Sequence, residues 1–305
     1  MHQSQPLPPR KGNHRTALVE PMASAKSPTM TVTTTDHWME SIDAGKLFAR
    51  QWTPSNACRS HRETIVLFHD SLGCVELWRD FPQNLATATC RSVVAYDRLG
   101  FGRSDAHPGI LPKTFIGDEA SLVVPRLCES LGLGAIIPFG HSVGGGMAIA
   151  TAARLPASCA AVITESAQSF IEDTTLSGLL AGKMKFQAPD QFERLKRYHS
   201  EKARWVLDAW IDTWLAPDFA DWSLDHDLPA VSCPALVLHG ERDEYGSRRH
   251  ADRIASLTSG PSQTLILEGC GHVPHREQPA LILKSVALFL SQYGSKTDAG
   301  DSGTV

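Results

Sequence analysis

The sequence predicts an α/β fold with a mostly parallel, doubly wound sheet, and three observations lead to this expectation. Six short runs are apolar along their whole length, and longer segments with apolar residues at helical spacing follow most of them. One stretch, 167–228, breaks this alternation and has the patterns of helices and loops alone. Runs that are apolar along their whole length are typical of strands buried on both faces by crossover helices. We expect such strands at 64–68, 92–96, 135–139, 161–164, 235–238 and 264–267.

The helical patterns complete a βαβ series along the chain. Residues 1–30 are rich in Pro, Ser, Gln and Lys without apolar periodicity, which predicts a disordered leader, and the composition of 294–305 predicts a disordered tail. The core then comprises 31–166 and 229–293, and 167–228 forms a helical cap inserted before the strand at 235–238. The ligand crevice is expected at the carboxyl ends of the strands. The helices are expected at 75–88, 118–131, 144–154, 248–256 and 279–290.

One predicted helix of the cap carries a wide apolar stripe. Val206, Trp210 and Trp214 lie four residues apart, so their side chains share one face of the helix. This face either packs the cap onto the core or, through Trp210 and Trp214, lines a substrate pocket. The sequence leaves both explanations open.

Composition excludes several classes of function. The 305 residues are 42% hydrophobic and 20% charged, with a formal net charge of -4. The Lys and Arg residues are scattered among acidic ones, so no surface for nucleic acid is predicted. No nucleotide-binding glycine pattern occurs in the right context, and no cofactor or metal is expected. We interpret the seven cysteines as thiols in a reducing compartment. The sequence also shows no secretory signal and no membrane-spanning run, so we expect the protein in the cytoplasm.

A nucleophile elbow is the strongest motif in the chain. The predicted strand at 135–139 runs into Gly140-His141-Ser142-Val143-Gly144, and a predicted helix follows. This Gly-x-Ser-x-Gly spacing alone should occur by chance in roughly one chain in ten of this length. Its position between a buried strand and a helix is the context that the motif requires. The glycines allow a very tight turn that holds Ser142 in a strained, exposed conformation.

A serine nucleophile needs a general base and a carboxylate that orients the base. The strand at 235–238 is followed by Asp243, and the strand at 264–267 by His272, in the chain order that this architecture requires. We therefore expect Ser142 as nucleophile, His272 as base and Asp243 as the orienting acid. The alternatives are carboxylates at Glu165, Asp225, Asp227 and Glu244, and a histidine base at His275.

Acyl transfer also needs two backbone N–H groups directed at the oxyanion. The residue after the nucleophile, Val143, supplies one. The second is expected in the loop after the first buried strand, from Ser71 or alternatively from Asp70. His69 begins this loop and is interpreted chiefly as a structural brace, with a place in the substrate pocket as a second role.

Over residues 46–293 the chain resembles the α/β-hydrolase superfamily, in the branch of carboxylesterases, carrier-protein methyl esterases, enol-lactonases and carbon–carbon bond hydrolases. The resemblance rests on the elbow at Ser142, the His69 loop, the Asp243 and His272 loops, and the segment 97–105, which is similar to the family's Asp-x-x-Gly-x-Gly-x-Ser turn. Asp70 stands where the family usually has glycine. Its carboxylate could repel the oxyanion or could point away and cap the next helix.

The resemblance implies hydrolysis of an ester or related acyl compound through an acyl-enzyme on Ser142. A carbon–carbon bond hydrolase or lyase with the same triad, and a ligand-binding protein without turnover, are the alternatives. The elbow serine argues against dehalogenases and epoxide hydrolases, which use aspartate there. The substrate is expected to be a small molecule, and basic residues in 183–204 leave an anionic or carrier-linked substrate open, although a solvated helix surface explains them more simply. The oligomeric state is not predicted.

Overall fold

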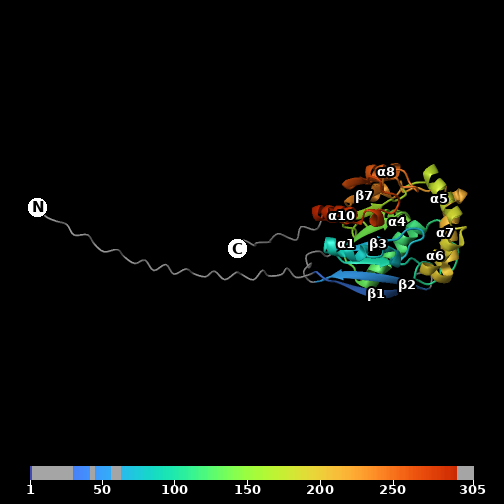
Figure 1. Ribbon diagram of the computed structural model, residues 1–305, viewed down its shortest axis with the longest axis horizontal. Helices are drawn as coiled ribbons and strands as arrows, with labels where there is room; N and C mark the ends of the chain where they lie inside the picture. The colour runs from blue at the N-terminus through green and yellow to red at the C-terminus, as the bar shows by residue number, and fades with distance from the viewer. Residues whose placement is uncertain (2–29, 42–44, 56–62, 294–305) are drawn as a thin grey trace.

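Eight strands form one sheet in the order β1-β2-β4-β3-β5-β6-β7-β8, with helices on both faces (Figure 1). The computed structural model describes residue 1 and residues 30–41, 45–55 and 63–293. Apart from residues 1 and 30, the predicted leader lies outside this range, as does the predicted tail. The strands are β1 Val32–Glu40, β2 Lys46–Pro54, β3 Thr64–Phe68, β4 Val93–Tyr96, β5 Ile136–His141, β6 Val162–Glu165, β7 Ala235–Gly240 and β8 Ser262–Leu267.

The six predicted strands are confirmed as the parallel part of the sheet, β3 to β8. The sequence analysis missed β1 and β2, which form an antiparallel pair at one edge, where β2 also pairs antiparallel with β4. Most residues of β1 are exposed, so this strand lacks the apolar pattern of a buried one.

Alternate residues of each buried strand face opposite layers. In β3, Val66 and Phe68 pack into the core cluster beneath the elbow helix, α4 (Val143–Arg154), whereas Ile65 and Leu67 pack into the cluster on the other face. Two helices that supply this second cluster, α1 (Phe81–Thr89) and α10 (Pro279–Tyr293), contact each other. The sheet is therefore covered on both sides, as the apolar runs predict.

The helices outside the cap agree with the predicted ones, with two interruptions. Arg79 adopts a left-handed conformation (φ 53°) and separates two short helices where one was expected. The second predicted helix contains a π-helical turn, η3, that ends two residues before Pro125, which has no N–H for the regular helical bond. These elements are η2 Val75–Trp78, α1 Phe81–Thr89, α2 Phe115–Asp118, η3 Glu119–Val123, α3 Val124–Leu131, α4 Val143–Arg154, α8 Arg249–Leu257, α9 Pro274–Glu277 and α10 Pro279–Tyr293.

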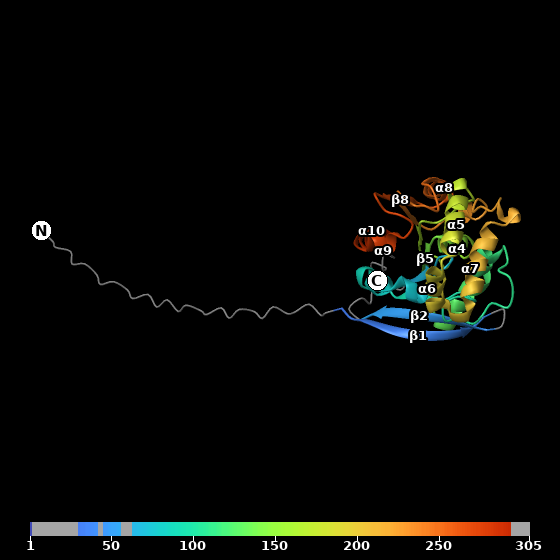
Figure 2. The same cartoon turned by 45° about the vertical axis from the view of Figure 1, so that its right-hand side comes forward.

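Between β6 and β7 the chain forms a helical insertion, whose long helices lie together along the right-hand side of the core in Figure 1 and in front of it in Figure 2. Its third long helix, α7, contacts both α5 and α6. The buried side of α7, which includes Val206, Trp210 and Trp214, belongs to the main hydrophobic core. The insertion comprises α5 Asp173–Lys185, α6 Pro189–His199, η4 Ser200–Lys202, α7 Ala203–Trp214, η5 Pro217–Phe219 and η6 Leu228–Ala230.

The cysteines only partly match the expectation of unpaired thiols. Cys90 is disulfide-bonded, which departs from the expected reducing environment. Five cysteines in the described part of the chain are free: Cys74, Cys128, Cys159, Cys233 and Cys270. Among the described residues, no helix combines the length and the apolar character needed to cross a bilayer.

Candidate active site

Ser142 lies in the sharp turn that joins β5 to α4, with φ 57° and ψ −126°. The two glycines of the motif make this turn possible. A Cβ atom on Gly140 would stand 1.9 Å from the Gly144 carbonyl oxygen, and one on Gly144 would stand 2.1 Å from the Phe68 carbonyl oxygen. Both positions meet backbone, so neither tolerates a side chain without a shift of the turn.

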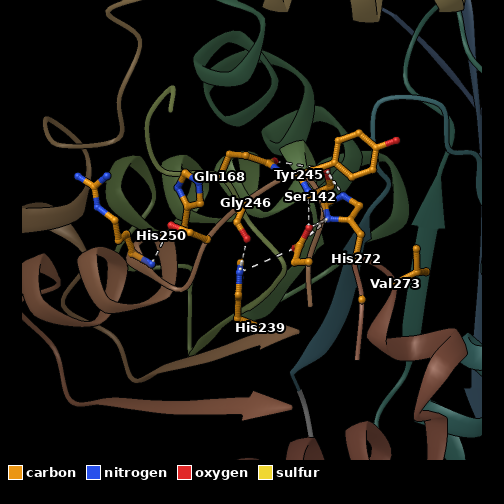
Figure 3. Close-up of polar contacts among 12 residues, drawn as sticks. Ser142, Gln168, His239, Tyr245, Gly246, His250, His272 and Val273 are labelled. Atoms are coloured by element: carbon orange, nitrogen blue, oxygen red, sulfur yellow. Dashed lines mark hydrogen bonds and ion pairs between the residues drawn. The ribbon is translucent and has the colours of Figure 1, made fainter. Parts of the chain in front are cut away.

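The structure brings Ser142, His272 and Asp243 together from three loops. Figure 3 shows Ser142 and His272 side by side. His272 Nε2 is 3.0 Å from Ser142 Oγ, and His272 Nδ1 is 2.8 and 2.9 Å from the two carboxylate oxygens of Asp243. With Nδ1–H donated to Asp243, Nε2 of the neutral ring is the acceptor that faces the serine hydroxyl. This geometry allows His272 to take the hydroxyl proton.

Asp243 is held as a carboxylate in a buried setting. Its side chain is fully buried, and burial opposes ionisation, but the nearby His272 and its hydrogen bond bring the pKa of Asp243 below the ordinary value. The Tyr245 N–H also donates to Asp243 Oδ1 at 2.8 Å. On the other side, His239 is 3.9 Å from Asp243 Oδ2, and burial lowers the pKa of that histidine, so it adds no positive charge at neutral pH.

Two further residues hold the loop of His272. His141, inside the elbow, donates from Nε2 to the backbone carbonyl of His272 at 2.7 Å. The Tyr245 ring packs against the imidazole of His272, with ring centroids 4.7 Å apart. The position of the base therefore depends on the elbow on one side and on the loop of the acid on the other.

The two predicted oxyanion donors are available. In the part of the chain that the structure describes, the N–H groups of Ser71 and Val143 have no acceptor. Ser71 and Ser142 line the same cavity. Val143 is the first residue of α4, where helix N–H groups have no partner within the helix and favour a negative charge.

Asp70 neither caps the following helix nor stands unpaired. Its Oδ1 accepts the Leu72 N–H at 2.8 Å, closing the loop, while the first N–H of η2, from Val75, donates to Asp97 instead. Its Oδ2 lies 3.5 Å from Nδ1 of His141. Burial works against ionisation, but His141 keeps the pKa of Asp70 below its ordinary value. The Asp70 carboxylate, which the sequence left free to repel the oxyanion, is thus directed at His141.

His69 braces this loop and does not line the cavity beside Ser142. Its Nδ1–H donates to the Asp70 carbonyl at 2.8 Å, and its Nε2 accepts the Arg98 N–H at 3.2 Å. Burial lowers the pKa of His69 well below the ordinary value, so the ring is neutral. Its position supports the structural role and not the pocket role.

A cavity of about 310 Å³ lies beside Ser142, between the core and the cap. Trp210 and Trp214 line it and also pack into the core, so both explanations for the apolar stripe apply. The wall also contains apolar side chains from both units and several polar ones, among them Leu72, Leu77, Thr175, Leu179, Glu244, Val273 and Arg276.

The rival residues occupy other places. Glu165 is buried and binds His275, with Oε2 2.8 Å from Nδ1 and the His275 N–H donated to Oε1. The His275 ring packs against Trp78 at a centroid distance of 4.6 Å. This pair is a second buried acid–histidine contact and ties β6 to α9. Asp225 pairs with Arg253 at the surface, Asp227 pairs with Arg154, and Glu244 is exposed at the cavity.

Sequence reasoning missed Gln168, which contacts the nucleophile. Gln168 Oε1 is 3.3 Å from Ser142 Oγ, and the residue is only 4% exposed. The one available signal was its position just after β6, at the sheet edge where the other site loops emerge. No group of three or more metal-ligating side chains occurs in the described residues.

Comparisons with known proteins agree with this architecture. Residues 65–284 match the model of a family described as the alpha/beta hydrolase family. The chain is 28% identical over 195 residues to serine hydrolase BPHL of Mus musculus, a match that covers 58% of this chain and 62% of that protein. It is 27% identical over 272 residues to the monoglyceride lipase of Homo sapiens, covering 82% of this chain and 88% of the lipase.

Among solved structures, the fold is similar to that of a membrane phospholipase A, a bacterial virulence factor. The TM-score is 0.67 at 20% sequence identity, and the match covers 85% of this chain and 86% of the phospholipase. At this identity the likeness concerns the fold.

Proposed function

The chain belongs to the alpha/beta hydrolase family, and from this premise we propose that it is a serine hydrolase that cleaves a carboxylic ester or a related acyl compound. The observation that carries the proposal is the continuous contact from Ser142 through His272 to the buried carboxylate of Asp243. The available N–H groups of Ser71 and Val143 beside the same serine add support.

The proposed reaction follows from these atoms. Ser142 Oγ bonds to the acyl carbon while its proton passes to His272 Nε2, and the carbonyl oxygen takes up the negative charge beside the N–H groups of Ser71 and Val143. The intermediate then collapses, and the leaving oxygen takes the proton from His272. A water molecule attacks the acyl-enzyme by the same route, which releases the acid and restores Ser142. Asp243 stabilises the imidazolium in both halves.

The cavity favours a small, largely apolar substrate group. About 310 Å³ accommodates a short acyl or alcohol portion, and Trp210, Trp214 and Leu179 offer apolar contacts. A relative named as a lipase and another named as a serine hydrolase support an ester as the substrate class.

Contacts in the basic segment favour a structural use of its charges over docking of a carrier. Lys202 donates to the carbonyls of Gly102 and Ser104 at 2.9 and 2.7 Å. Arg204 stacks over the ring of Phe192, with its guanidinium carbon 4.5 Å from the centroid. Lys202 and Arg204 thus already have partners within the protein.

Hydrolysis of p-nitrophenyl acetate, butyrate and octanoate tests the proposal. We expect the wild type to release p-nitrophenol, Ser142→Ala to lose turnover, and Ser291→Ala, on the surface of α10, to match the wild type. The preferred chain length gives a first size for the acyl site. If wild type and Ser142→Ala are equally inactive, the ester proposal fails, and the carbon–carbon alternative becomes the next to test.

A further inference from the structure

The side chain of Gln168 is directed at Ser142 Oγ (Figure 3). It is buried, lines the substrate cavity and belongs to neither the triad nor the oxyanion loop. A buried amide in contact with the attacking oxygen atom is a second hydrogen-bonding partner for the hydroxyl and so affects where its proton goes.

The hydroxyl of Ser142 has one proton and faces two acceptors. His272 Nε2 is one of them, at 3.0 Å, because Nδ1–H is committed to Asp243. Gln168 Oε1, at 3.3 Å, is the other. If the proton goes to Gln168, it is not available to the base. A half-turn of the amide exchanges Oε1 for Nε2, so that Gln168 donates to Oγ and the hydroxyl donates to His272.

The backbone that presents Gln168 is strained and tightly packed. Ser166 has φ 48°, a conformation that is costly for a residue other than glycine and that tends to occur at functional sites. Its N–H donates to the Leu238 carbonyl at 2.9 Å. Ala167 packs against the elbow helix so closely that a Cβ on Gly145 would lie 2.4 Å from the Ala167 Cβ.

On its other side, Gln168 is followed by a buried polar anchor. The Ser169 N–H donates to His250 Nδ1 at 3.1 Å, and His250 Nε2 lies 3.1 Å from Glu172 Oε1. Glu172 also accepts the N–H and the hydroxyl of Ser247, at 2.6 and 3.0 Å. Because Ser247 and Asp243 lie in the same loop between β7 and α8, the segment that carries Gln168 is fixed to the loop that carries Asp243.

We propose that Gln168 is a catalytic residue that donates a side-chain N–H to Ser142 Oγ. This inference rests on the proposed function and adds a residue to it. In the first half-reaction the donated N–H leaves the hydroxyl proton to His272. In the second, the bond between Oγ and the acyl carbon breaks, the electron pair goes to Oγ, and His272 returns the proton. The Gln168 N–H stabilises the negative charge that develops on Oγ before that proton arrives.

The test compares the wild type with two variants whose side chains at position 168 are about as long as that of glutamine. Gln168→Met removes the donor, and we expect kcat to fall about tenfold to a hundredfold with KM nearly unchanged, the range expected for losing one hydrogen bond to a developing charge. Gln168→Glu replaces the donor by an acceptor. We expect its activity relative to wild type to fall as pH rises from about 5 to 8, because the carboxylate then ionises beside Ser142 Oγ, where negative charge develops during the reaction.

Labelling of Ser142 with a fluorophosphonate separates the two levels of the inference. If the wild type neither labels nor turns over p-nitrophenyl butyrate, the proposed function fails, and the role of Gln168 fails with it. If the wild type does both but each variant stays within twofold of it, with a constant activity ratio across the pH range, only the role of Gln168 is overturned. Should Gln168→Met not fold, the pH-dependent ratio of the isosteric Gln168→Glu decides.

Discussion

Replacement of Asp243 by asparagine should place His272 in the wrong tautomer while leaving the loop intact. Oδ1 of Asp243 accepts the Tyr245 N–H at 2.8 Å, so an asparagine keeps its carbonyl oxygen at that position. Its NH₂ group then takes the place of Oδ2, 2.9 Å from His272 Nδ1. The carbonyl oxygen is also 2.8 Å from Nδ1 but already accepts the Tyr245 N–H, whereas the NH₂ group can only donate. We therefore expect Nδ1 to become the acceptor and the ring proton to move to Nε2, which then no longer accepts a proton from Ser142.

The expected loss is large because the imidazolium also loses its buried counter-charge. The corresponding aspartate-to-asparagine change in a serine protease triad lowers kcat by about 10⁴, or about 5 kcal/mol of transition-state stabilisation. Asp243 is equally well buried, with a side chain that is 0% exposed. We therefore expect a loss of similar size here.

The assay is kcat and kcat/KM for p-nitrophenyl butyrate, measured on Asp243→Asn and on Asp252→Asn as a matched control. Asp252 is an exposed residue of α8 that pairs with Arg248, so its amide variant should match the wild type. If Asp243→Asn keeps activity within tenfold of wild type at an unchanged melting temperature, Asp243 does not orient the base, and the tautomer argument is wrong.

Two further predictions concern stability. Gly144→Ala would bring its Cβ to 2.1 Å from the Phe68 carbonyl, and we expect it to lower the free energy of unfolding by about 3 kcal/mol or more, whereas Gly134→Ala, with nothing within 4 Å, should be neutral in urea unfolding; equal stability of the two variants would contradict the steric account of the elbow. His199 accepts the Gly102 N–H at 2.9 Å, and burial lowers its pKa from 6.5 to about 4. The unfolded chain therefore binds a proton at His199 more readily than the folded protein does. The contribution of neutral His199 to the free energy of unfolding is fully present above pH 6.5, and about 3 kcal/mol is lost as the pH falls toward 4. Urea unfolding at several pH values should show a shallower decline for His199→Gln, and an unchanged slope would count against a neutral His199.

The parts of this site that the sequence predicts are those with a local signature. The elbow at Ser142 needs glycine at fixed positions, and Asp243 and His272 follow recognisable buried strands. The parallel strands are predictable for the same reason, since burial on both faces leaves a continuous apolar run. The exposed strand β1 has no such run and was missed.

The remaining features depend on contacts between distant parts of the chain. Gln168 is held beside Ser142 in part because Ser169 binds His250, which lies far along the sequence. No sequence pattern around residue 168 predicts either contact. Asp70 similarly gave two possible orientations, and its actual one depends on His141, which a separate element supplies. Side-chain partners of this kind emerge only once the loops are placed together.

The most direct test of the central claim is whether Ser142 carries the acyl group during turnover. Wild type mixed with p-nitrophenyl acetate, quenched in acid within milliseconds and examined by peptide mass spectrometry, should show one acetyl group on the peptide that contains Ser142, and Ser142→Ala should show none. Turnover without any modified serine, or an acetyl group on another residue with Ser142 free, would contradict the account.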